Sequence, residues 1–148
     1  MAAFSEPTGN AQSWPAEILN RIERLKSAPV NWDVDTVGEI FGSHAPESNG
    51  RKLEAMIETD EGDSLVISLR VSTVPSAAPL EGQVTFLLDP TYPHRIITKR
   101  VRNSWAILKI SAAEWFTVAA IADEGRTVLT YSLRQLPGAP EWFKVGDG

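Results

Sequence analysis

The side chains that could carry out chemistry are few and widely spaced. His44 and His94 could act as a general base near neutral pH without a large change in pKa. Ser104 and Asp89 could complete a Ser-His-Asp arrangement with His94, but no Gly-x-Ser-x-Gly motif surrounds the serine. The histidines lack the spacing of metal ligands, and the chain has no cysteine. We therefore expect no catalytic residues, no metal and no cofactor.

A basic segment stands out from an acidic chain. Arg95, Lys99, Arg100 and Arg102 place four positive charges within residues 94–102, although the 148 residues together carry a net charge of −5. The segment predicts a surface for an acidic protein partner or a nucleic-acid backbone. It is also typical of an edge strand whose charges prevent aggregation. The overall negative charge makes nucleic acid an unlikely partner.

Tryptophan is the other unusual feature, with five residues of this type in the chain. Four of them are expected to pack under loops or at one end of the fold: Trp14, Trp32, Trp115 and Trp142. Trp105 differs because it follows the polar residues 102–104 and begins a strand. An aromatic side chain beside a loop suits ligand recognition better than it suits a core.

The elements that must position these residues are mainly strands. Apolar and polar residues alternate in seven segments, which are residues 53–57, 65–71, 84–88, 97–101, 106–110, 116–120 and 129–133. Such alternation is typical of strands with one buried face. Seven short strands separated by turn residues predict an all-β, immunoglobulin-like β-sandwich. Residues 60–63 and 123–126 predict tight hairpins around a glycine.

A helical segment precedes the strands. Ile18, Ile22 and Leu25 lie at helical spacing and predict an amphipathic helix over residues 15–26, with a second short helix over 33–41. We expect a disordered tail at residues 1–14, a helical segment and loop at 15–50, and the sandwich domain at 51–145. No apolar run is long enough to span a membrane, and the start does not resemble a signal peptide, which favours a cytoplasmic protein.

Residues 84–93, Val-Thr-Phe-Leu-Leu-Asp-Pro-Thr-Tyr-Pro, resemble the YEATS domain signature. There a strand ends in a polar turn and is followed by a basic strand and a loop that carries an aromatic residue. The similarity is greatest to the prokaryotic YEATS branch, in which a strand like residues 116–120 and a terminal segment like residues 136–140 also occur. It covers residues 52–143. The resemblance implies an immunoglobulin-like fold and a non-enzymatic reader domain in bacterial signalling or defence.

The resemblance also implies a binding site, because eukaryotic YEATS domains bind acylated lysine. Thr91 matches the hydroxyl residue that hydrogen-bonds the acyl amide, and Tyr92 and Trp105 match the two aromatic walls. Asp89 stands where the family has histidine, and Ser104 where it has glycine. An acidic Asp89 could instead favour a cationic ligand such as lysine or methyl-lysine. These five residues are the candidate ligand-binding set.

Two alternatives remain open at this point. The protein could be a protein–protein adaptor that has no small-ligand pocket and uses the helix at residues 15–26 and the basic segment, with Arg95, Lys99, Arg100 and Arg102 as partner contacts. Alternatively, Tyr92 and Trp105 could pack against each other to close the sandwich. The sequence does not predict the oligomeric state.

Overall fold

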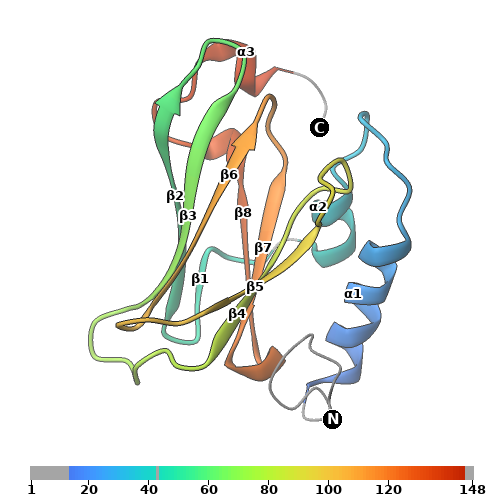
Figure 1. The fold of residues 1–148 in the computed structure, drawn as a ribbon. Coiled ribbons are helices and arrows are strands. Elements are labelled where there is room, and N and C mark those ends of the chain that lie inside the picture. Colours follow the sequence, from blue (N-terminus) through green and yellow to red (C-terminus); the bar gives the residue numbers. More distant parts are fainter. Residues whose placement is uncertain (1–13, 43, 146–148) are drawn as a thin grey trace.

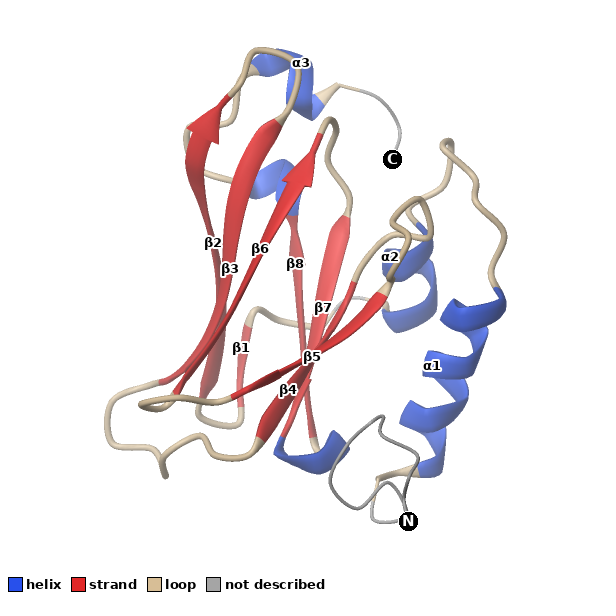
Figure 2. Ribbon diagram, in the orientation of Figure 1, coloured by secondary structure: helices blue, strands red, loops and turns tan. Residues whose placement is uncertain are grey.

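Two four-stranded antiparallel sheets lie face to face in the computed structural model, which describes residues 14–42 and 44–145 (Figures 1 and 2). The first sheet has the order β1 (Glu47–Ser48), β2 (Arg51–Asp60), β3 (Leu65–Thr73), β6 (Trp105–Ala112). The second has the order β5 (Ile96–Arg100), β4 (Gln83–Leu87), β7 (Thr117–Ala122), β8 (Thr127–Ser132). The predicted β-sandwich is confirmed, and each predicted strand overlaps an observed one.

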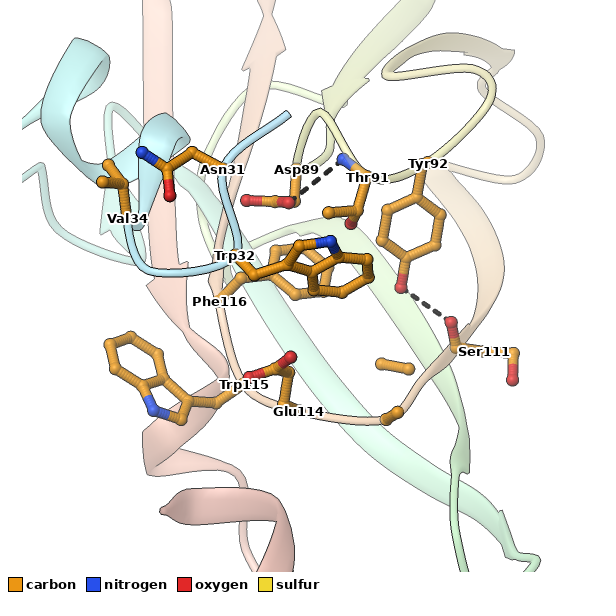
Figure 3. Close-up of a pocket in the computed structure, with 12 residues that line it drawn as sticks. Asn31, Trp32, Val34, Asp89, Thr91, Tyr92, Ser111, Glu114, Trp115 and Phe116 are labelled. Carbon is orange, nitrogen blue, oxygen red and sulfur yellow. Dashed lines mark hydrogen bonds between the residues drawn. The ribbon is translucent and has the colours of Figure 1, made fainter. Parts of the chain in front are cut away.

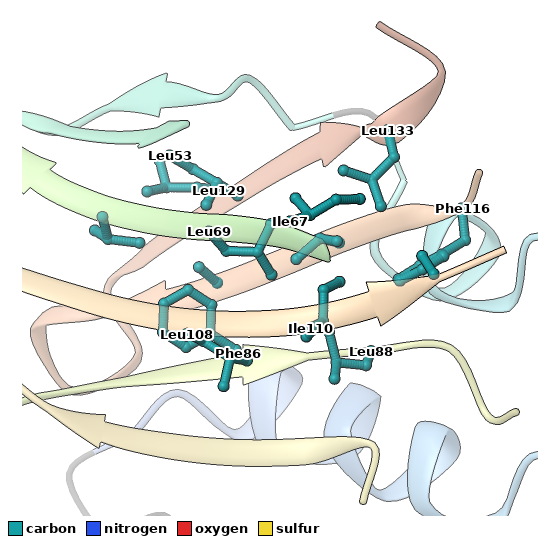
Figure 4. Close-up of a cluster of buried hydrophobic side chains, with 14 of the residues drawn as sticks. Leu53, Ile67, Leu69, Phe86, Leu88, Leu108, Ile110, Phe116, Leu129 and Leu133 are labelled. Atoms are coloured by element: carbon teal, nitrogen blue, oxygen red, sulfur yellow. The ribbon is translucent and has the colours of Figure 1, made fainter. Parts of the chain in front are cut away.

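The main core lies between the two sheets. Alternate residues of each strand point into it, as in β6, where every second side chain is buried and the others are exposed. Its larger members come from both sheets and are Leu53, Ile67, Leu69, Phe86, Leu108, Ile110, Phe116 and Leu129 (Figure 4). Phe143, from the short helix α3 (Glu141–Lys144), is also fully buried there.

A second core lies on the outer face of the second sheet, beneath α1 (Ala16–Ser27) and α2 (Thr36–Phe41) (Figure 1). Ile22 and Leu25 of α1 pack there with Ile121 of β7. Every side chain of β7 is buried because the strand is covered on both faces. The apolar face of α1 is therefore occupied within the fold.

Arg95 fastens α1 to the sandwich. Its Nη1 donates to the carbonyls of Leu25 (2.8 Å) and Ala28 (2.6 Å), and its Nη2 donates to the carbonyl of Pro90 (3.2 Å). Carbonyls at the end of a helix have no partner within the helix, so a guanidinium there satisfies them. Arg95 was predicted to contact a partner protein, and in the structure its Nη1 and Nη2 groups form hydrogen bonds within the fold.

We expect Arg95→Met to lower the free energy of unfolding by about 1.5–3 kcal/mol, the range for hydrogen bonds that involve a charged group. The variant keeps an apolar stem but loses the bonds that hold the end of α1. Urea denaturation followed by circular dichroism measures the effect. Arg100→Met is the matched control, because Arg100 is exposed and should change stability by less than about 0.5 kcal/mol. Equal effects of the two variants would contradict this role of Arg95.

The connections differ from prediction in detail. The hairpin at residues 60–63 is present, with Gly62 at a φ of 93°. The hairpin at residues 123–126 is also present, between β7 and β8, and Asp123, Glu124 and Gly125 in its 3-10 turn all have positive φ. The segment 43–50 was predicted as a loop but contains β1. Of the predicted disordered tail, only Trp14 is described, and it is buried in the second core. Within the described residues, no helix has the length and apolar character needed to cross a membrane.

Candidate functional site

Three of the five predicted site residues line one open pocket at an end of the sandwich. Asp89, Thr91 and Tyr92 follow β4 and form one side of it, and Phe116 and Trp32 also line it (Figure 3). The cavity has a volume of about 200 Å³. Three segments far apart in the sequence therefore meet here: the loop before α2, the loop after β4, and the connection between β6 and β7.

Asp89 shapes the turn that presents the next residues to the pocket. Its carboxylate accepts a hydrogen bond from the backbone N–H of Thr91 (3.1 Å), and its carbonyl accepts one from the N–H of Tyr92 (3.0 Å). An aspartate that bonds the backbone two residues ahead stabilises a turn. The residue is only 7% exposed, and burial raises the pKa of its carboxyl group although the hydrogen bond from Thr91 opposes the shift.

Tyr92 is a fixed wall of the pocket. Its hydroxyl donates to the carbonyl of Ser111 on β6 (2.7 Å), and its ring packs against Phe116 with centroids 5.4 Å apart and planes inclined by 56°. Burial raises the pKa of its hydroxyl, so the group is neutral and available as a donor. The ring is therefore held by both sheets before any ligand arrives.

Trp32 provides the exposed aromatic surface of the pocket, with 64% of the residue accessible. It lies in a turn in which Asn31 accepts hydrogen bonds from the backbone N–H of Asp33 (3.0 Å) and of Val34 (3.3 Å). Asp35 fixes the end of this turn by accepting from the N–H of Thr117 on β7 (2.9 Å). The prediction that Trp32 packs under a loop is wrong, since its ring is open to solvent.

Trp105 and Ser104 are not part of this pocket, contrary to the prediction. Trp105 begins β6 and exchanges two backbone hydrogen bonds with Arg102, whereas Tyr92 contacts Ser111. Ser111 lies six positions further along the strand, which at about 3.3 Å per residue is roughly 20 Å away. The physical reason is β5, which runs back along the sandwich between the two segments. The start of β6 therefore lies at the opposite end from the turn that follows β4.

The lining combines aromatic surface with acidic groups. Trp115 is buried beside Phe116, and the carboxylates of Asp89 and Glu114 are the charged groups in the lining. No lysine or arginine is among the described residues that line it. Aromatic faces and carboxylates together attract a cation, and the apolar walls suit an aliphatic stem.

The geometry gives no support to the candidate chemistry of His94 and Ser104. His94 precedes β5 and Ser104 follows it, so a whole strand separates the two side chains. Among the described residues, no cluster of three or more histidine, aspartate or glutamate side chains could hold a metal ion.

No family model, curated protein or solved structure matches the chain.

Proposed function

We propose that the protein is a non-enzymatic recognition module whose pocket binds one modified lysine side chain of a partner protein. The observation that carries this proposal is an open aromatic pocket in which Trp32 is exposed while Tyr92 is held rigidly. Its volume of about 200 Å³ is below the range of roughly 300–1,000 Å³ that is typical of sites for whole small molecules. A single long side chain is a better fit than a cofactor.

The charges of the pocket favour a methylated lysine over an acylated one. An acyl-lysine amide is neutral and could use the Thr91 hydroxyl as a donor and the Asp89 carboxylate as an acceptor. A methylammonium group would gain more, because it is attracted by aromatic faces and by two carboxylates, Asp89 and Glu114. We therefore propose methylated lysine as the preferred ligand and acyl-lysine as the second candidate.

The order of the strands supports the immunoglobulin-like assignment. In that fold the first, second and fifth strands share one sheet, and the third strand lies beside the sixth, which lies beside the seventh. Here β2, β3 and β6 share a sheet, while β4, β7 and β8 are neighbours in the other, with β5 at its edge. β5 departs from this order, because the fourth strand of the seven-stranded immunoglobulin fold joins the first sheet, whereas β5 lies beside β4 in the second.

The relation to prokaryotic YEATS domains is likewise a proposal. Placement of Thr91 and Tyr92 in one pocket at an end of the sandwich supports it. The position of Trp105 does not, because the second aromatic wall is Trp32, which lies before the region of resemblance. A role in bacterial signalling or defence would follow from the same relation.

Isothermal titration calorimetry with one peptide sequence in four forms tests the function. The central lysine is trimethylated, acetylated, crotonylated or unmodified. We expect the trimethylated form to bind most tightly and the unmodified form to bind weakly. Tighter binding of an acylated form would keep the module but reverse the order of ligands. Failure of all four forms to bind would contradict the proposal.

Affinity for the trimethyl-lysine peptide should fall as the pH is lowered through the pKa of Asp89. The charge of trimethyl-lysine does not depend on pH, so the loss reports on the carboxylates of the protein. Because burial raises the pKa of Asp89, the loss should begin above the ordinary aspartate value of about 4. The Asp89→Asn variant should bind more weakly at neutral pH and show a flatter pH profile. An unchanged profile would remove Asp89 from recognition.

The same raised pKa has a consequence for folding. The folded state holds the Asp89 proton more tightly than the unfolded state does, so this carboxyl destabilises the fold as pH rises from its ordinary to its raised pKa. Asp89→Asn should therefore not lose stability at neutral pH through charge, which separates its binding effect from unfolding.

A further inference from the structure

A second surface lies at the other end of β6 from the aromatic pocket. It contains a hollow of about 310 Å³, which is lined by Lys99 and Arg100 of β5, by Arg102, and by Trp105 and Ile107 of β6. Trp105 and Ile107 are 42% and 45% exposed. We call these five residues, together with the neighbouring exposed Lys109, the β5–β6 basic patch. In Figure 2, β5 and β6 come close together at this end of the sandwich.

The cations of this patch are not used within the described fold. Most other basic side chains there have a partner, such as Arg51 with Asp123 or Arg70 with Glu54. No ion pair or hydrogen bond joins the side chains of Lys99, Arg100, Arg102 or Lys109 to a described residue. Four unpaired positive charges in an acidic chain create a local positive potential, which attracts a negatively charged partner.

The patch adjoins a free strand edge. β6 is the last strand of its sheet and pairs only with β3. Trp105 exchanges backbone hydrogen bonds with Arg102, so its N–H and C=O groups point away from β3. In an antiparallel pair every second residue points its backbone groups to the same side. The N–H and C=O groups of Ile107 and Lys109 therefore also point away from β3. No described residue forms a backbone hydrogen bond with them there. Such groups are a template for one further strand.

We propose that the β5–β6 basic patch binds an acidic, extended segment of a partner protein, which adds to the sheet as a strand beside β6. Strand addition would satisfy the free backbone groups of Ile107 and Lys109. Acidic side chains on the added strand would meet Arg100 and Arg102, which line the hollow beside β6.

A peptide suits this surface better than a nucleic acid does. A nucleic acid carries a phosphate at every nucleotide and would extend beyond the patch over a protein whose net charge is −5. A short acidic peptide places its charge only where the cations are. The unpaired backbone groups also match a peptide backbone, with its alternating donors and acceptors, and not a phosphate chain, which has acceptors alone.

Fluorescence anisotropy with a labelled peptide of alternating glutamate and threonine tests the proposal. We expect binding at about 50 mM salt that weakens severalfold at about 300 mM, because exposed charges are screened. Arg100→Gln/Arg102→Gln should weaken binding about tenfold. Arg24→Gln/Lys144→Gln removes the same charge outside the patch and should change affinity less than twofold. Trp32→Ala should leave this binding unchanged, which separates it from the lysine pocket.

Three results would overturn the proposal. They are no binding of the acidic peptide, equal loss in the two double variants, or binding of a short oligothymidylate in preference to the peptide. Amide hydrogen exchange tests strand addition itself. The N–H groups of Ile107 and Lys109 should become protected when the peptide is bound. Binding that leaves both amides unprotected would also contradict the proposal.

Discussion

Replacing Trp32 with alanine is expected to weaken binding of the trimethyl-lysine peptide about thirtyfold while leaving the melting temperature nearly unchanged. Buried tryptophans at binding interfaces contribute about 2 kcal/mol or more when truncated, and about 1.4 kcal/mol corresponds to tenfold. Trp32 is 64% exposed in the free protein, so removal of its ring deletes little of the folded core. Calorimetry and thermal unfolding of the same sample measure the two quantities.

Trp105→Ala is the matched control for this variant. Trp105 is also an exposed tryptophan, but it lies near the opposite end of β6, where the guanidinium of Arg70 stacks 4.3 Å from its ring centroid. It should bind the trimethyl-lysine peptide with unchanged affinity. If Trp105→Ala abolished binding and Trp32→Ala did not, the ligand would bind at the end of the sandwich where Trp105 lies, and the assignment of the ligand to the Trp32 pocket would be wrong.

The largest loss of stability is expected from Arg51→Met. Nε and Nη2 of Arg51 donate to the two carboxylate oxygens of Asp123 at 3.0 and 2.9 Å, and its Nη1 donates to the carbonyl of Ala78. Asp123 also accepts a hydrogen bond from Thr127 (2.6 Å). Arg51 belongs to the first sheet and Asp123 to the turn between two strands of the second, so the ion pair joins the sheets.

Removing one member of a buried ion pair leaves the other charge without a partner, which lowers the free energy of unfolding by about 3–5 kcal/mol. The free energy of unfolding of a typical domain is about 5–15 kcal/mol, so this cost is a large part of it. Glu54→Gln disrupts the more exposed pair with Arg70 and is the control, with an expected cost of about 0–1 kcal/mol. Urea denaturation at neutral pH measures both. A cost for Arg51→Met no greater than that of the control would contradict the structural role of the pair.

The pH dependence of this effect has a definite sign. Burial alone would raise the pKa of Asp123, but hydrogen bonds from Arg51 and Thr127 outweigh it and lower the pKa. The pair therefore stabilises the fold fully above the ordinary aspartate pKa of about 4, and its contribution is lost as the pH falls through the lowered value. The stability difference between the parent and Arg51→Met should shrink on acidification over that interval.

The sequence predicted the sandwich well because alternation is a local property. Leu65, Ile67 and Leu69 share the buried face of β3 whatever surrounds them, and the same pattern marks the other strands. The helix α1 was equally visible from Ile18, Ile22 and Leu25. The burial of β7 on both faces depends on where α1 and α2 dock, and no local pattern shows that a helix will cover a particular sheet.

The site was predicted only in part, for two different reasons. Asp89, Thr91 and Tyr92 are neighbours in one turn, so a pocket lined by one of them lies close to the others. The second aromatic wall depends on long-range contacts, such as the hydrogen bond that holds Asp35 to Thr117. The wrong prediction for Trp105 could have been avoided by following the direction of the chain through the strands. With β5 running back between them, the turn after β4 and the start of β6 must lie at opposite ends.

The same reasoning explains why Trp32 was missed. It follows Asn31, a residue typical of turns, and precedes a helix, so it was as loop-borne as Trp105. Spacing alone could not distinguish between the two. Only the contact between the loop before α2 and the end of the sandwich makes Trp32 the one that faces Tyr92 and Phe116 across the pocket.

The indole N–H signals of the tryptophans, followed by nuclear magnetic resonance during titration with the trimethyl-lysine peptide, test the central claim most directly. Each tryptophan gives its own signal, which single substitutions assign. We predict that the indole signal of Trp32 and the backbone amides of Thr91 and Tyr92 shift together, while the indole of Trp105 stays in place. Saturating peptide that leaves Trp32 unmoved, or that moves Trp105 instead, would contradict the claim that this pocket recognises the modified lysine.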